Sequence, residues 1–206
     1  MGIDRLIEWV APSVAPEFAP PLFDEAAGRA TLAAAGRSAD DHARVLHRWN
    51  GAYALRGSLH LFGARTEPPN QSLDAWNAPG GWRQGFGATL DGVTLFAETA
   101  FGDQFGYRDG KVVWFHAMEA RVERMASGFS EWLECVFIEP GRYLSIELFD
   151  ACVAAHGPLP YGGHFAPRTP WRGDALTAGT VEVVPSRDSM ERKAAASMTG
   201  VRARVP

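Results

Sequence analysis

The chain has little lysine, little cysteine and no long apolar run, and these scarcities argue against some classes of protein. Of its 206 residues only Lys111 and Lys193 are lysines, against eighteen arginines. Its two cysteines, Cys135 and Cys152, stand in apolar contexts, which favours buried free thiols in a reducing compartment. A disulfide between them is the alternative that the sequence leaves open. No window approaches eighteen apolar residues and the N-terminus lacks a secretory pattern, so we expect a soluble cytoplasmic protein without a membrane span.

Motifs for catalysis and for metal binding are also missing. The sequence contains no H-E-x-x-H, no G-x-S-x-G and no phosphate-binding loop with its lysine. His60 and His116 fall on expected strands, and either could form an acid–base group with Glu98 or Asp103. A structural role is the more common one for a histidine on a strand. We therefore expect no catalytic residue, no metal and no cofactor.

Charge is unevenly distributed along the chain. The formal net charge is −4, which argues against nonspecific binding of nucleic acid. Residues 91–150 contain eleven acids and five bases, whereas residues 151–206 contain four acids and seven bases. An acidic surface on or beside the central strands is expected. Such a surface is either a solvated face that keeps the protein soluble or a partner site, and composition does not separate the two.

The stretch from Val93 to Met125 predicts four short strands joined by tight turns. Val93, Leu95 and Ala97 alternate with Thr94, Phe96 and Glu98, with the period of two of a pleated strand. Asp109-Gly110 suits a two-residue type I′ hairpin turn, and the strand over 111–116 is rich in β-branched and aromatic residues. The segment 120–124 predicts a fourth strand at the sheet edge, because Val122 is its one strong apolar residue.

Other elements flank this block on both sides. Helical spacing of apolar residues predicts helices over 3–10, over 39–51 with Ser38 as N-cap, over 127–137, and over 142–156. Part of 23–35 is also expected to be helical, after a stiff proline-rich connector over 12–21. A hairpin is expected over 53–64, a loop over 66–70 and a helical turn over 72–77. The tail predicts an ordered loop over 161–179, a strand over 180–184 and a Ser186-capped helix to about 198. Together these elements predict an α+β fold with an antiparallel sheet of about five or six strands flanked by N- and C-terminal helices.

Several phrases resemble the SUKH superfamily, the SMI/KNR-like proteins, in the order in which that superfamily has them. They are, in sequence, Trp49-Asn50-Gly51-Ala52-Tyr53, Gly57-Ser58-Leu59-His60-Leu61-Phe62-Gly63, Leu73-Asp74-Ala75-Trp76-Asn77, and Phe96-Ala97 followed by Phe101-Gly102-Asp103-Gln104-Phe105-Gly106-Tyr107. The resemblance covers about residues 40–160. It implies a SUKH-like domain over 1–160 with its core at 40–160, and a C-terminal extension over 161–206 that packs on this domain.

The resemblance also implies a function, because many bacterial SUKH proteins are immunity proteins that bind and block a cognate toxin, often a nuclease. For this chain it implies a protein-binding module with a toxin as partner, and no direct contact with nucleic acid or membrane. A regulatory or scaffold adaptor is the second alternative. A small-molecule-binding or enzymatic domain with a sheet pocket around His60 and His116 is the third.

Two kinds of residue are candidates for contact with the partner. Acidic residues of the central block would face a basic cleft of the toxin, and loop aromatics would anchor the complex. The acidic candidates are Glu98, Asp103, Glu119 and Glu123, and the aromatic candidates are Trp82, Tyr161 and Trp171, with Phe86 as a further exposed aromatic. For Asp103, a capping role in its own turn is the more common alternative.

Overall fold

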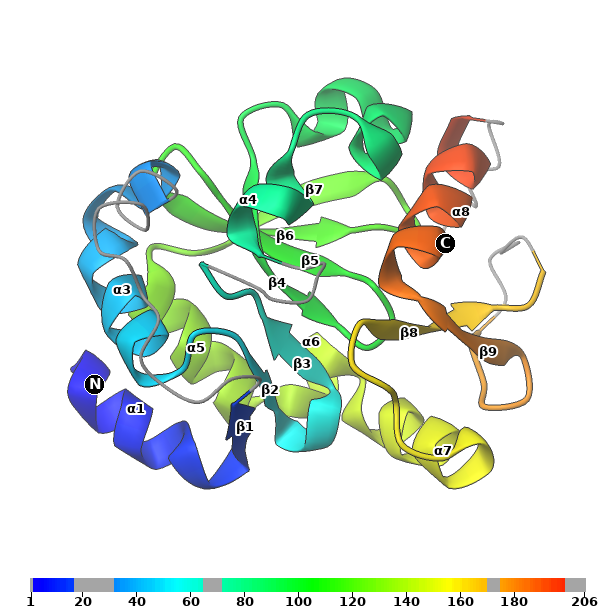
Figure 1. Cartoon of the computed structure of the whole chain (residues 1–206), viewed down its shortest axis with the longest axis horizontal. Helices are drawn as coiled ribbons and strands as arrows, with labels where there is room; N and C mark the ends of the chain where they lie inside the picture. The colour runs from blue at the N-terminus through cyan, green and yellow to red at the C-terminus, as the bar shows by residue number, and fades with distance from the viewer. Residues whose placement is uncertain (1, 17–31, 65–71, 170–174, 199–206) are drawn as a thin grey trace.

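A computed structural model describes residues 2–16, 32–64, 72–169 and 175–198 of the chain. Two antiparallel sheets and a set of helices make up these residues (Figure 1). The α+β class expected from the sequence is confirmed. The large sheet has seven strands rather than the expected five or six, and a separate two-stranded sheet follows it.

The large sheet is a meander in which each strand pairs with the next one along the chain. Its strands are β1 (Val14–Pro16), β2 (Ala52–Ala54), β3 (Leu59–Leu61), β4 (Thr94–Thr99), β5 (Gln104–Arg108), β6 (Lys111–His116) and β7 (Arg121–Ala126). The four-strand block and the hairpin before it are confirmed, and β7 lies at the sheet edge as expected. Asp109 (φ 52°) and Gly110 (φ 68°) both have the positive φ that a type I′ turn requires.

The helices lie on both faces of this sheet (Figure 1). In chain order they are α1 (Ile3–Val10), η1 (Ala11–Ser13), η2 (Leu32–Ser38), α3 (Ala39–Arg48), η3 (Leu55–Gly57), α4 (Leu73–Asn77), η4 (Gly81–Leu90), α5 (Phe129–Ile138), α6 (Pro140–Leu144), α7 (Ile146–His156) and α8 (Ser186–Met198), the η elements being 3₁₀ helices. Trp132 of α5 packs on Phe96 and Phe105 of one sheet face. On the opposite face Phe86 of η4 packs on Phe115 of β6.

Two strands were not expected from the sequence. β1 lies inside the proline-rich connector and pairs with β2. Pro16 is the last residue of β1, and the sheet tolerates a proline there because β1 is an edge strand. β8 (Gly163–Pro167) lies in the segment expected to be a loop and pairs with β9 (Val181–Pro185), which corresponds to the strand expected over 180–184. A short segment rich in Gly and Pro has only a weak strand pattern in its sequence. Pairing with a partner strand is what stabilises it as a strand.

The helical predictions needed two further corrections. The helix expected over 142–156 is broken into α6 and α7 by Ser145, whose φ of 51° is left-handed. Ser38 does not cap the helix that follows it, because its Oγ accepts a hydrogen bond from the backbone N–H of Phe129, 3.0 Å away at the start of α5. The expected loop over 66–70 and most of the helical segment over 23–35 lie outside the described residues.

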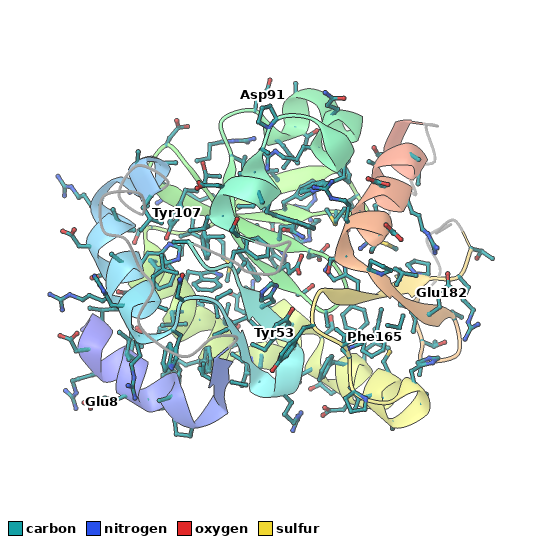
Figure 2. The ribbon with its side chains drawn as sticks, in the orientation of Figure 1. Glu8, Tyr53, Asp91, Tyr107, Phe165 and Glu182 are labelled. Carbon is teal, nitrogen blue, oxygen red and sulfur yellow. The ribbon has the colours of Figure 1, made fainter. Side chains whose placement is uncertain are left out.

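Two separate hydrophobic clusters form the interior. The main cluster fills the space between the large sheet and its helices, and it includes Met190 and Ala194 of α8. A smaller cluster contains Ala100, Phe149, Cys152, Phe165 and Val181, from the β4–β5 turn, α7 and the β8–β9 hairpin. Figure 2 shows Phe165 between α7 and this hairpin. The elements β8, β9 and α8 therefore pack on the rest of the protein partly through the main core and partly through this second cluster.

Candidate functional site

A row of four polar side chains crosses the large sheet. The strand register places Tyr53 opposite His60, His60 opposite Glu98, and Glu98 opposite Gln104. Directly opposed residues of antiparallel neighbours point to the same face, so all four lie on the face that η4 and α8 cover. Each of them is buried. Polar groups without water need partners, and neighbouring strands and α8 supply several hydrogen bonds to this row.

Glu98 is the centre of a buried hydrogen-bond network. Its Oε1 lies 3.0 Å from Nδ1 of His60 and accepts a bond from Oγ of Ser186 at 3.3 Å. Its Oε2 lies 3.1 Å from Nε2 of His164 and accepts a bond from Nε2 of Gln104 at 3.2 Å. These five residues, called here the Glu98 network, come from β3, β4, β5, β8 and α8. The network thus joins the large sheet to the C-terminal elements.

Glu98 is ionised in this network. Burial by itself would raise the pKa of Glu98, but His164 and His60 outweigh that effect and hold the pKa well below its usual range. Burial lowers the pKa of His164 even though the Glu98 carboxylate raises it. At neutral pH we therefore assign a carboxylate to Glu98.

A buried ammonium group lies beside the network. Nζ of Lys193 donates to the carbonyl oxygen of Phe101 at 2.6 Å and to Oγ of Ser189 at 3.0 Å. Burial lowers the pKa of Lys193 to about 8, and the carboxylates of Asp103 and Glu98 oppose that shift. At neutral pH the ammonium form still dominates, and it offsets the negative charge of Glu98 inside the protein.

A second set of charged side chains lies on the other sheet face, near the β6–β7 turn, and is partly exposed. Nε2 of His116 lies 3.0 Å from Oε1 of Glu123, and its Nδ1 lies 3.8 Å from Oδ2 of Asp103. Arg121 forms ion pairs with Glu119, at 2.9 Å, and with Glu123. Asp103, Glu119 and Glu123, together with His116 and Arg121, are called here the carboxylate cluster. Counting His116 as uncharged, its formal charge is −2.

The sheet pocket that the third functional alternative requires around His60 and His116 does not form. His60 belongs to the buried row, which continues through Gln104 to Phe115 of β6. Successive side chains of a strand point to opposite faces, so His116 points away from that row. Each histidine has a carboxylate neighbour, as the sequence suggested, but the two pairs lie on different faces.

The structure separates the residues that the sequence proposed for partner contact. Glu98 is 2% exposed and Trp82 is 3% exposed, so both expectations of surface contact are wrong, and Phe86 is likewise buried. Tyr161 is 67% exposed, which agrees with its proposed role. Trp171 lies outside the described residues. Trp82 and Phe86 are anchors of η4 in the main core, because a glycine-rich helix needs large side chains to fix it.

The exposed candidates do not form one patch. The ring of Tyr161 stacks on that of Tyr53, with centroids 4.5 Å apart, and Tyr53 belongs to β2. The side chains of Glu119 and Glu123 are 34% and 44% exposed and lie at β7 and the turn before it. Since neighbouring strands are about 4.8 Å apart, five strand spacings put β2 about 24 Å from β7. Asp103 joins the acidic group, and its Oδ1 also accepts a bond from the N–H of Ala117.

Sequence reasoning missed the C-terminal half of the Glu98 network. His164 stands between Gly163 and Phe165 in a segment expected to be a loop, and Ser186 was assigned a capping role only. Lys193 is one of the two lysines of the chain, which was a signal that it has a specific position. No local pattern indicates that these residues meet Glu98, because the contacts span up to 88 residues.

Neither a metal centre nor a membrane span is found in the part of the chain that the structure describes. Within those residues no group of three or more His, Cys, Asp or Glu side chains is arranged to hold a metal ion. None of the described helices is both long and apolar enough to cross a bilayer. Cys135 and Cys152 are unbonded thiols.

Comparison with known proteins gives a likeness of fold. No family model matches the chain, and no curated protein matches it. Among solved structures, the crystal structure of Atu4351 from Agrobacterium tumefaciens is similar, with a TM-score of 0.58 and 15% sequence identity, over 90% of this chain and 86% of that one. At this identity the similarity shows a common fold and does not transfer a function.

Proposed function

We propose that this chain is a non-catalytic protein-binding module, an immunity protein that binds and neutralises a cognate bacterial toxin in the cytoplasm. The resemblance of residues 40–160 to the SUKH superfamily is the basis of this proposal. The structural observation that supports it best is the carboxylate cluster, because its acidic side chains are partly exposed and held in place by His116 and Arg121.

The cluster suits a partner with a basic cleft, such as the active site of a nuclease. Glu119 and Glu123 would occupy the positions that substrate phosphates take, so the bound module would exclude the substrate. Arg121 bonds to both carboxylates and limits their motion before binding, which lowers the entropy lost on association. Complementary charge would also raise the association rate, most strongly at low salt.

Charge reversal at Glu119 and Glu123 tests this proposal once the toxin is identified. The double variant Glu119→Lys, Glu123→Lys should lower the association rate with the toxin by about tenfold or more at low salt, with a smaller loss at high salt. Inhibition of the toxin should weaken in parallel. A matched control is Glu8→Lys, Glu147→Lys, which reverses two exposed acids on α1 and α7.

The control should leave association and inhibition unchanged. Equal inhibition by the cluster variant and the wild-type protein would remove the cluster from the interface. The two other classes of function predict different outcomes in the same binding experiments. An adaptor should bind several partners, whereas a ligand-binding or enzymatic domain should bind no toxin.

A further inference from the structure

Strand β7 is an open edge of the large sheet. It runs over six residues, from Arg121 to Ala126, and Arg121, Glu123 and Arg124 are exposed. Among the residues that the structure describes, no backbone hydrogen bond joins β7 to anything other than β6. The opposite edge is β1, which has three residues and ends in Pro16, so it offers a much shorter ladder. β7 is therefore the edge at which a further strand can add to the sheet.

The β5–β6 hairpin determines the direction of the backbone groups of β6. Its two-residue turn over 109–110 makes Arg108 and Lys111 a hydrogen-bonded pair, in which both residues bond across the hairpin. Bonded and non-bonded pairs alternate along an antiparallel ladder. Three residues after Lys111, Trp114 consequently turns its N–H and C=O groups away from β5 and towards β7.

The same alternation gives the outward groups of β7. Glu123 is directly opposite Trp114, so its N–H and C=O groups face β6. Its neighbours Val122 and Arg124 then turn their N–H and C=O groups away from β6, to the open side of the strand. Two donors and two acceptors are thus available to a strand that lies alongside β7.

The charges of β7 oppose pairing with a second copy of the chain. Directly opposed residues of antiparallel strands have Cβ atoms about 5 Å apart, and like charges there are destabilising. Two copies paired about Glu123 place the two Glu123 carboxylates opposite each other, and pairing about Arg124 does the same for two guanidinium groups. Pairing about Val122 brings in Ala120, whose φ of 49° is not extended. A second copy is therefore a poor occupant of this edge.

A strand with the complementary pattern meets no such obstacle. It needs a basic residue opposite Glu123, an acid opposite Arg124 and an apolar residue opposite Val122, which is half-buried against the main core. Charged edge strands exclude unselected partners, so the same side chains supply selectivity. Glu123 also belongs to the carboxylate cluster, which makes this edge continuous with the surface that we assign to the toxin.

We propose that an extended segment of the toxin pairs with β7 and becomes an additional strand of the large sheet. The segment contains a basic residue flanked by an acid and an apolar residue. This inference rests on the proposed function and adds the backbone of β7 to the contacts of the carboxylate cluster. Main-chain hydrogen bonds supply affinity in this mode of recognition, and the opposed side chains supply specificity.

Amide hydrogen exchange tests the open edge in the free protein and the added strand in the complex. In the free protein the amides of Val122 and Arg124 should exchange fast, whereas those of Arg121 and Glu123 should be protected by their bonds to β6. The bound probe is the toxin domain that a pull-down with the tagged protein identifies. It should slow exchange at Val122 and Arg124 by about tenfold or more.

A proline on the edge tests the main-chain bonds directly. Arg124→Pro removes one outward N–H and leaves the bonds between β6 and β7 in place, as proline does on edge strands and at bulges. Arg124→Ala is the matched control, because it removes the same charge and keeps the N–H. The proline variant should bind the toxin domain about tenfold or more weakly than the alanine variant, and both should keep the wild-type circular dichroism.

Arg124 lies outside the carboxylate cluster, so the results separate the two proposals. A toxin that binds both Arg124 variants equally would leave the proposed function standing and remove the added strand. Amides of Val122 and Arg124 that are protected in the free protein, or unprotected in the complex, would also remove it, and they decide the matter if Arg124→Pro does not fold.

Two further results would overturn the proposal. A wild-type dimer that Arg124→Pro converts to a monomer in sedimentation velocity would make a second copy the occupant of the edge. A pull-down that recovers no toxin would end the proposed function, and the added strand with it.

Discussion

At the scale of single residues, the largest departure from expectation is the place of Glu98. Its position in the acidic segment 91–150 suggested a surface carboxylate, but it is the acceptor at the centre of a buried network. A buried carboxylate is tolerated only where donors and a counter-charge replace water. Here the donors come from three strands and α8, and Lys193 supplies the counter-charge.

Replacing Glu98 by glutamine should therefore destabilise the protein strongly. The variant keeps the shape of the side chain, but it removes the charge that Lys193 faces and presents a donor to His60 or His164. We expect a loss of about 3 kcal/mol in the free energy of unfolding at pH 7, measured with urea. The loss should shrink below about pH 4.3, because the lowered pKa of Glu98 gives a contribution that is complete above that value and fades in acid.

An exposed ion pair provides the control for Glu98. Glu182 accepts a bond from Arg192 at 2.7 Å, and both side chains are open to solvent. Glu182→Gln should cost less than about 1 kcal/mol. Equal losses for the two variants would show that the Glu98 network adds nothing beyond a surface pair.

His42 gives a second residue-scale prediction. Its Nδ1 lies 3.0 Å from the Tyr107 hydroxyl, and burial lowers its pKa to about 3. Unfolding exposes the imidazole, so its share of stability is complete above about pH 6.5 and falls by about 1.4 kcal/mol per pH unit as the pH drops towards 3. His42→Gln should lower the pH slope of the free energy of unfolding by about 1.4 kcal/mol per pH unit, measured with urea between pH 6 and 4.

The control for His42 lies on the same helix. His47 is exposed in α3, and His47→Gln should leave the slope unchanged. A wild-type slope in His42→Gln would mean that another group controls acid unfolding.

At the scale of elements, a strand was predictable where its partner is close in sequence, and it was not predictable where its partner is distant in sequence. The Asp109-Gly110 turn and the alternation on both sides of it specify the β5–β6 hairpin locally. β1 and β8 contain Pro16 and Gly163, and each becomes a strand because a partner separated from it in sequence supplies the ladder. The break in the helix at Ser145 had no local signal, because a single serine does not indicate a left-handed residue.

Gly102 allows the close approach between the β4–β5 turn and the elements β8 and α8. Its φ of 86° is left-handed, and a Cβ at this position would lie 2.2 Å from Nζ of Lys193 and 2.9 Å from Nδ1 of His164. Gly102→Ala should cost about 2 kcal/mol or more, because the positive φ strains an alanine and the Cβ displaces Lys193 and His164. The displacement of α8 and β8 should also raise the rate at which a thiol reagent modifies Cys152, which is buried in the second cluster.

A glycine in open space is the matched control for Gly102. Gly92 also has positive φ, at 68°, but no atom lies within 4 Å of the position that its Cβ would take. Gly92→Ala should show the backbone cost alone and leave Cys152 protected. Equal exposure of Cys152 in both variants would contradict the role given to the contact with Lys193 and His164.

At the scale of the whole molecule, the sequence predicted the fold class and half of the site. The acidic excess of residues 91–150 indicated an acidic surface, and the structure places Glu119, Glu123 and Asp103 together on it. Composition did not indicate that Glu98 belongs to the interior, because its burial depends on β8 and α8, which are distant in sequence. Tyr161 is exposed as expected, but it lies across the sheet from the acidic group.

We propose that this chain binds one toxin through the carboxylate cluster. The most direct measurement is a pull-down from the organism that encodes it, with tagged wild-type protein and the Glu119→Lys, Glu123→Lys variant side by side, quantified by mass spectrometry. We expect one dominant partner that contains a toxin domain. The wild-type protein should recover this partner at near-equal stoichiometry, and the variant should recover much less of it. Several unrelated partners, or equal recovery of one partner with both proteins, would contradict it.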